Sequence, residues 1–124
     1  MSALLAWLAG IVVAGWGVMH IMPSKKVVAG YEPLTDENRW ILLMEWVAEG
    51  IAYIFVGVLL AAATVRGAHG NEVTVTVYAV SAGMLVVMAV WTVLTGARAS
   101  NVMFKICPVV LTSAAAMLLA AIVL

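Results

Sequence analysis

Charged residues are scarce in this chain of 124 residues: they make up 10% of it, whereas soluble domains contain about 25%. Hydrophobic residues make up 66% of the chain, well above the usual soluble share of about 45–50%. The composition therefore predicts an integral membrane protein. Six basic residues balance six acidic ones, so the chain lacks the overall positive field that would indicate a nucleic-acid partner.

The chain also lacks the signatures of common reactions. Its single cysteine, Cys107, excludes a disulfide within the chain. There is no phosphate-binding glycine loop, nucleophile elbow or dinucleotide fingerprint. His20 with two glutamates would be a chemically suitable ligand set, but no second histidine lies close by in the sequence, so we predict no metal site. Whether the protein is an enzyme stays open.

Four long apolar runs occupy most of the sequence. Each can cross a hydrocarbon core of about 30 Å as a helix that rises about 1.5 Å per residue. A lone strand would leave its backbone groups unpaired in lipid, so helices are expected throughout. We expect one all-α domain over residues 1–124, a polytopic membrane protein with a four-helix transmembrane bundle. Its spans are expected at approximately residues 3–22, 38–65, 73–97 and 102–124.

Short polar segments connect these runs. The first connection, Ser24 to Leu34, contains glycine and proline and is expected to be a loop. Thr35 then has the character of a helix N-cap, and the helix that follows is long enough to tilt or to protrude from the bilayer. The other loops are expected at Arg66 to Glu72 and at Arg98 to Asn101.

The basic residues are distributed unevenly over the two ends of such a bundle. Arg66 alone belongs to the end that carries the second loop. The opposite end holds five basic residues: Lys25, Lys26, Arg39, Arg98 and Lys105. By the positive-inside rule, the first and third loops of this multi-pass protein face the cytoplasm and both termini lie outside the cell membrane. Three residues at the basic end are expected to anchor the bundle at the lipid interface: Arg39, Trp40 and Arg98.

The second span carries two carboxylates, Glu45 and Glu49, which lie four residues apart and so on one helix face. Tyr53 continues the same row. A carboxylate at bilayer depth costs on the order of 2.5–3.5 kcal/mol on insertion scales, so we expect this face to point into the protein. His20, near the end of the first span, and Lys105, at the start of the fourth, lie at a similar depth. These five residues are predicted to form a polar pocket.

Each pocket residue also has a simpler interpretation. His20 could be a hydrated, inert ring at the interface. Glu45 could be solvated at the interface, and Glu49 could make a structural hydrogen bond only. Lys105 and Arg98 could merely set topology. Tyr53 and the five tryptophans could be packing and interfacial belt residues.

Small residues are spaced for close helix packing. Ala6, Gly10 and Ala14 form a small-residue row on the first span, and Gly57 and Ala61 form another on the second. Because lipid supplies no hydrophobic drive between helices, we expect these rows to carry the packing within the bundle or within an oligomer.

Three short segments resemble those of a known family. GVMHIMP (residues 17–23), EGIAYIFVGVLL (49–60) and SNVMF (100–104), in this order, resemble the DoxX-like group of small four-helix membrane proteins. The resemblance implies a four-helix bundle with a polar pocket formed by His20 and Glu49. It also implies either a subunit associated with a quinone-linked oxidoreductase or a membrane assembly or accessory role.

Our leading functional hypothesis is an accessory or redox (quinone)-associated membrane subunit with a His/Glu pocket in its cytoplasmic half. The cofactor stays open, and a quinone or another lipid-soluble molecule is one candidate. The first alternative is a proton-coupled carrier or pore for a small solute, formed by self-association, in which Glu49 binds and releases the proton. The second is a structural assembly partner. Beyond the lipid bilayer, the expected partners are a second copy of the chain or a larger membrane complex.

Overall fold

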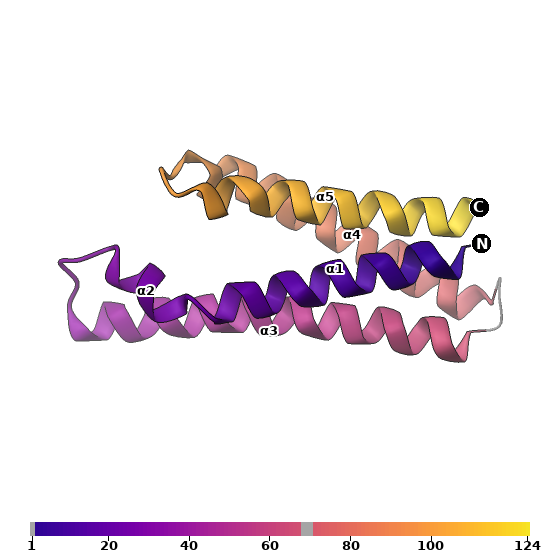
Figure 1. Cartoon of the computed structure of the whole chain (residues 1–124), viewed down its shortest axis with the longest axis horizontal. Helices are drawn as coiled ribbons and strands as arrows, with labels where there is room; N and C mark the ends of the chain where they lie inside the picture. Colours follow the sequence, from indigo (N-terminus) through magenta and orange to yellow (C-terminus); the bar gives the residue numbers. More distant parts are fainter. Residues whose placement is uncertain (1, 68–70) are drawn as a thin grey trace.

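The computed structural model describes residues 2–67 and 71–124, and the chain folds into helices that pack lengthwise (Figure 1). Four of these helices are long and apolar enough to cross a membrane, which suggests a multi-pass membrane protein. The all-α, four-helix bundle expected from the sequence is therefore confirmed. In chain order the elements are α1 (Ala3–Ile21), α2 (Ser24–Ala29), α3 (Asp36–Arg66), α4 (Glu72–Leu94), the 3₁₀ turn η1 (Gly96–Arg98) and α5 (Val102–Val123).

The long helices begin and end within three residues of the predicted spans. The Thr35 side chain caps α3 as expected, because its hydroxyl oxygen accepts a hydrogen bond from the Asn38 backbone N–H at 3.2 Å. Asn71 and Asn101 cap α4 and α5 in the same manner. Of the predicted second loop, residues 68–70 lie outside the described part of the chain.

The predicted first loop contains a helix, α2, which corrects the expectation of a plain loop. Pro23 directly precedes it, where a residue without an N–H costs no helical hydrogen bond. Ser24 and Val28, one turn apart, are buried, whereas Lys25 and Lys26 are exposed. The short helix therefore packs one face against α3, and its six residues are too few to give a periodic signal in the sequence.

Two pairs of glycines bring α1 and α3 into close contact. A Cβ atom built on Gly17 would lie 2.5 Å from the carbonyl oxygen of Gly50, and one built on Gly57 would lie 2.6 Å from that of Gly10. No side chain fits between backbones this close, so glycine is required at these crossings. The expected packing role of the rows that contain Gly10 and Gly57 is thus confirmed. The same contacts fix the register that brings the end of α1 alongside the middle of α3.

The core runs along the centre of the bundle. Small residues of α1, Ala6 and Ala9, leave room for α5 to approach. The largest fully buried side chains come from all four long helices: Val13, Tyr53, Leu60, Tyr78, Leu85, Leu111 and Leu118. The protein therefore has a closely packed interior, while many large apolar side chains face outward on every long helix, as a lipid environment requires.

The bundle consists of two helix pairs, α1 with α3 and α4 with α5, joined mainly through α1 and α5. The hydrogen bonds between α3 and α4 lie near the connection between these helices. Thr64 Oγ1 and Tyr78 Oη are 2.6 Å apart, and Thr74 Oγ1 donates to the Ala63 carbonyl at 3.5 Å. Figure 1 shows the two pairs close together at that end and further apart toward α2. This divergence leaves space for the candidate site.

Both termini lie at one end of the bundle, where the Ser2 N–H donates to the Ala121 carbonyl at 2.9 Å (Figure 1). Arg66 belongs to this end. The elements that carry Lys25, Lys26, Arg39, Arg98 and Lys105 gather at the other end. The structure thus has the uneven distribution of basic residues on which the predicted orientation rests.

Candidate functional site

The site is centred on His20, a residue that is only 5% exposed. The Gly17–Gly50 contact lies one turn earlier on α1 and presses this part of the helix against α3. The Trp46 indole stacks on the imidazole, with ring centroids 4.1 Å apart and planes 11° apart. Trp46 Nε1 also donates a hydrogen bond of 2.5 Å to the carbonyl oxygen of His20, a group at a helix end that lacks an intrahelical partner. One α3 side chain therefore holds both the ring and the backbone of His20.

Glu49 faces the imidazole from the next turn of α3. Its Oε2 lies 3.3 Å from His20 Nε2, and its Oε1 accepts a hydrogen bond of 2.7 Å from the Tyr53 hydroxyl. Tyr53 is fully buried, and its ring meets the imidazole edge-on at 5.8 Å. The carboxylate is thus positioned by a phenol on its own helix and by an imidazole on α1.

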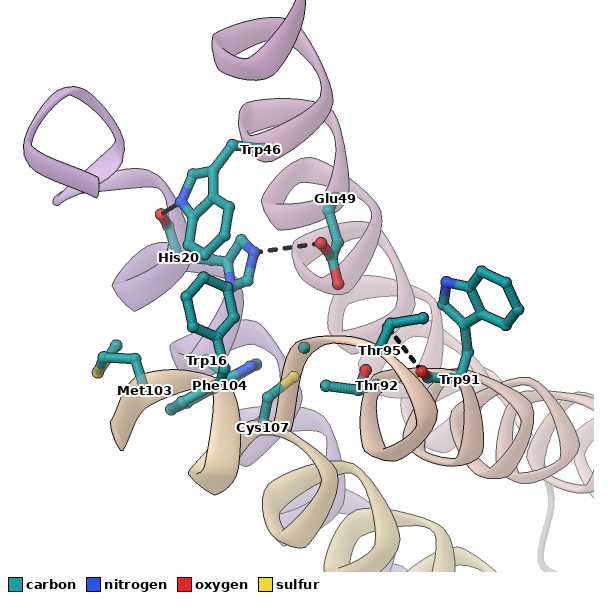
Figure 2. Close-up of a pocket in the computed structure, with 11 residues that line it drawn as sticks. Trp16, His20, Trp46, Glu49, Trp91, Thr92, Thr95, Met103, Phe104 and Cys107 are labelled. Atoms are coloured by element: carbon teal, nitrogen blue, oxygen red, sulfur yellow. Dashed lines mark hydrogen bonds and ion pairs between the residues drawn. The ribbon is translucent and has the colours of Figure 1, made fainter. Parts of the chain in front are cut away.

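His20, Trp46 and Glu49 line a cavity of about 180 Å³ between the diverging helix pairs, whereas Tyr53 lies behind its wall (Figure 2). Figure 2 shows Trp46 over His20 and the Glu49 side chain directed toward the imidazole. All four long helices and η1 contribute to the wall, which is mostly aromatic and apolar. The lining residues are Trp16, His20, Trp46, Glu49, Trp91, Thr92, Thr95, Gly96, Met103, Phe104 and Cys107.

The site has few charges to balance one another. Within the ranges that the structure describes, the Glu49 carboxylate has an ion-pair contact only with His20, whereas Arg39 pairs with Glu32 at 2.7 Å. A partly buried carboxylate without a cation is costly, so a protonated His20 is the group that stabilises an ionised Glu49. The 3.3 Å contact lacks the alignment of a hydrogen bond. The pair thus places a carboxylate oxygen and an imidazole nitrogen side by side at the cavity.

The structure brings together three of the five predicted pocket residues, His20, Glu49 and Tyr53. The other two do not join them. Glu45, one turn before Glu49, is exposed, and Lys105 is exposed on α5. Neither residue lines the cavity. For Glu45 the solvated alternative agrees with this placement. Lys105 lies only two residues before Cys107 but on a different face of α5.

The predicted interface anchors lie apart from the cavity. Arg39 pairs with Glu32 near the start of α3, Trp40 is 70% exposed, and Arg98 is exposed in η1. All belong to the same end of the bundle as α2. Their contact with a lipid interface stays a prediction.

Sequence reasoning missed most of the aromatic wall. Trp16 and Trp46 were assigned to packing or to a lipid belt, yet both contact the site. A signal existed, because Trp16 precedes His20 by four residues and Trp46 precedes Glu49 by three, which places each indole on the face of a pocket residue. Phe104 and Cys107 gave no such signal. The one pocket residue predicted on α5 is Lys105, and it does not line the cavity.

In residues 2–67 and 71–124, no group of three or more His, Cys, Asp or Glu side chains is placed to hold a metal ion. Comparisons with protein-family models, with curated proteins and with solved structures found no match.

Proposed function

We propose that this protein binds the ring of a lipid-soluble molecule of the quinone class at the His20–Glu49 pair, as an accessory or redox-associated subunit of a membrane complex. One observation carries the proposal. A buried imidazole and a carboxylate stand in contact on the wall of a cavity that is otherwise largely aromatic and apolar. Aromatic side chains favour stacking with a planar ring, and the polar pair would orient it.

The pair also supplies suitable proton chemistry. A quinol loses its hydroxyl protons as it gives up electrons, and a Glu49 carboxylate in contact with His20 is a natural acceptor for one of them. Tyr53 would keep the carboxylate oriented through its 2.7 Å hydrogen bond. The electrons would pass to a redox group of a partner subunit, which is why we place the protein in a complex.

The orientation proposed for the membrane puts this cavity in the cytoplasmic half. The five basic residues at the α2 end support cytoplasmic first and third loops, with both termini outside. Glu49 lies 13 residues beyond the first residue of α3, so we place it within the hydrocarbon region.

Membership of the DoxX-like group is part of the proposal. A four-helix bundle with His20 beside Glu49 is what that resemblance implies, and both features agree with it. Neither feature is specific to one family.

A proton-coupled carrier is the alternative that the packing disfavours. Between the cavity and the end that holds the termini, the interior is filled by fully buried side chains of all four long helices, such as Leu60, Leu85 and Leu111. A solute path through one copy would have to cross this core. A carrier would therefore need a path between copies. The other alternative, a structural assembly partner without a ligand, would not need the cavity.

Reconstitution separates these functions. We expect purified protein in liposomes to show no proton-driven solute flux, and a short-tailed quinone to quench the fluorescence of the tryptophans that line the cavity. Glu49→Gln should weaken that quenching, whereas Glu45→Gln, at an exposed position on the same face, should not. Flux that disappears in Glu49→Gln would favour the carrier. Neither flux nor quenching would leave only an assembly role and overturn the proposal.

A further inference from the structure

Two buried nitrogen atoms at the cavity have no hydrogen-bond partner among the described residues. They are Trp16 Nε1 and His20 Nε2. Both residues line the cavity, and His20 is more than nine-tenths buried. His20 Nε2 nevertheless has the Glu49 carboxylate 3.3 Å away, so Trp16 Nε1 is the atom without a polar contact. Buried polar groups are nearly always paired in folded proteins, which indicates that the contents of the cavity supply a partner for Trp16.

Most of the other hydrogen-bond donors on the wall are already engaged, and Trp91, which also lines the cavity, is 65% exposed. The Thr92 hydroxyl donates to the Met88 carbonyl at 2.8 Å, and the Thr95 hydroxyl donates to the Trp91 carbonyl at 2.7 Å. The Trp46 N–H is bonded to the backbone of His20. α1 and α3 present two indole N–H groups to this cavity, and only that of Trp16 lacks a hydrogen bond. The Cys107 thiol lies beside it, but sulfur is a weak acceptor, so the Trp16 N–H can still donate to a ligand.

We propose that Trp16 is a recognition residue that donates a hydrogen bond to a second oxygen of the ligand, while the first oxygen is a hydroxyl bound at the His20–Glu49 pair. This inference rests on the proposed function and specifies its ligand: a ring with two oxygens, one of which carries a hydrogen. An indole N–H can only donate, and an ionised carboxylate can only accept. Glu49 Oε1 is occupied by Tyr53, so Oε2 is the acceptor that faces the hydroxyl.

Trp16 and the His20–Glu49 pair thus select different chemical groups of the ligand. An ether or carbonyl oxygen satisfies Trp16. At the pair, such an oxygen can accept only from a protonated His20, whereas a hydroxyl can also donate to Glu49 Oε2. A ring with a hydroxyl and a second oxygen fits both Trp16 and the pair, as a quinol does. Water is the competing occupant, because the cavity is large and polar enough to hold it. Water in place of a ring would satisfy the Trp16 N–H without any preference among ring compounds.

The test uses two stable probes that differ only in a methoxy group, which carries the second oxygen: 4-methoxy-1-naphthol and 1-naphthol. Titration calorimetry in detergent, against protein-free micelles, should show the wild type binding the methoxy compound about fivefold more tightly, as expected for one hydrogen bond. Trp16→Phe keeps an aromatic ring but removes the N–H, so it should abolish this preference and leave 1-naphthol binding nearly unchanged. Trp91→Phe, on the same cavity wall, should preserve the preference.

A measurement on the wild type guards against misfolding of the variant. With ¹⁵N-labelled tryptophan, the Trp16 indole resonance should shift on addition of 4-methoxy-1-naphthol and shift far less with 1-naphthol. If Trp16→Phe weakens both probes equally, or neither, Trp16 contributes packing only and the inference is wrong. If neither probe binds the wild type, the proposed function itself fails.

Discussion

His20 is held by three different interactions from α3: a stacked indole, a carboxylate and the edge of a phenol ring. Each restricts the imidazole in a different direction. The ring is therefore fixed before any ligand arrives, which is the condition for a site that orients its ligand. The same arrangement makes the two polar residues depend on each other.

This dependence predicts a double-mutant result. His20→Ala removes the only cationic partner of Glu49 within the described chain, and Glu49→Ala removes the partner of the imidazole. Unfolding in mixed micelles should give free energies that are non-additive by about 1–2 kcal/mol when the changes are combined. Glu45→Ala should be milder than Glu49→Ala, because Glu45 is exposed. Additivity within about 0.3 kcal/mol would mean that the residues do not interact.

Trp46 gives a second prediction at this scale. Trp46→Phe keeps an aromatic ring over His20 but deletes the N–H that bonds the His20 carbonyl. The loss should lower the free energy of unfolding by about 1 kcal/mol, the typical net value of one hydrogen bond. Trp40→Phe provides the control, since Trp40 is 70% exposed and should change stability little. Equal effects of the two changes would argue against the bond.

Part of this residue-level picture could be predicted from the sequence. The depth of His20 and Glu49 along their helices predicted that they meet, because apolar helices leave few places for a buried charge. Which face of α5 turns inward could not be predicted, since its apolar residues surround the helix and lipid accepts all of them. Lys105 was misplaced for this reason, and Phe104 was missed.

At the scale of elements, the glycine contacts between α1 and α3 determine the site. Gly10 meets Gly57 and Gly17 meets Gly50, so the two backbones touch at two points separated by about two helical turns. A shift of one turn would move His20 away from both Trp46 and Glu49. Small-residue rows were visible in the sequence, but which row meets which depends on the register, and that is a property of the packed pair.

A leucine scan tests this register. Gly17→Leu should lower the free energy of unfolding in detergent by about 1–3 kcal/mol, because the new leucine side chain would meet the Gly50 backbone. Gly15→Leu is the matched control on the same helix, where a Cβ atom meets nothing within 4 Å. If both substitutions had the same effect, close backbone contact at Gly17 would not be what holds α1 against α3.

At the scale of the whole molecule, the basic residues predict the direction of insertion. Single cysteines at Lys25 or Ala99, in a Cys107→Ser background, should be protected from an impermeant thiol reagent in intact cells. A cysteine at Glu72, at the other end of the bundle, should react. The reverse pattern would invert the proposed topology, and labelling at both ends would indicate mixed insertion.

The divergence of the two helix pairs is the feature of the whole molecule that the sequence could not predict. The four apolar runs and their caps specify the helices, yet nothing in them shows that α3 and α4 separate toward the α2 end. That separation turns a buried contact between His20 and Glu49 into one wall of a cavity. Whether the cavity holds a molecule decides between a ligand site and a merely structural pair.

Native mass spectrometry of the protein, released gently from its own membrane, tests this central claim most directly. We predict a retained molecule of defined mass on the wild type and on Glu45→Gln, with absorbance of a quinone or quinol after extraction. Glu49→Gln should retain much less of it while remaining folded and helical. Wild-type protein that is folded and free of any bound molecule, or equal retention by Glu49→Gln, would contradict the account.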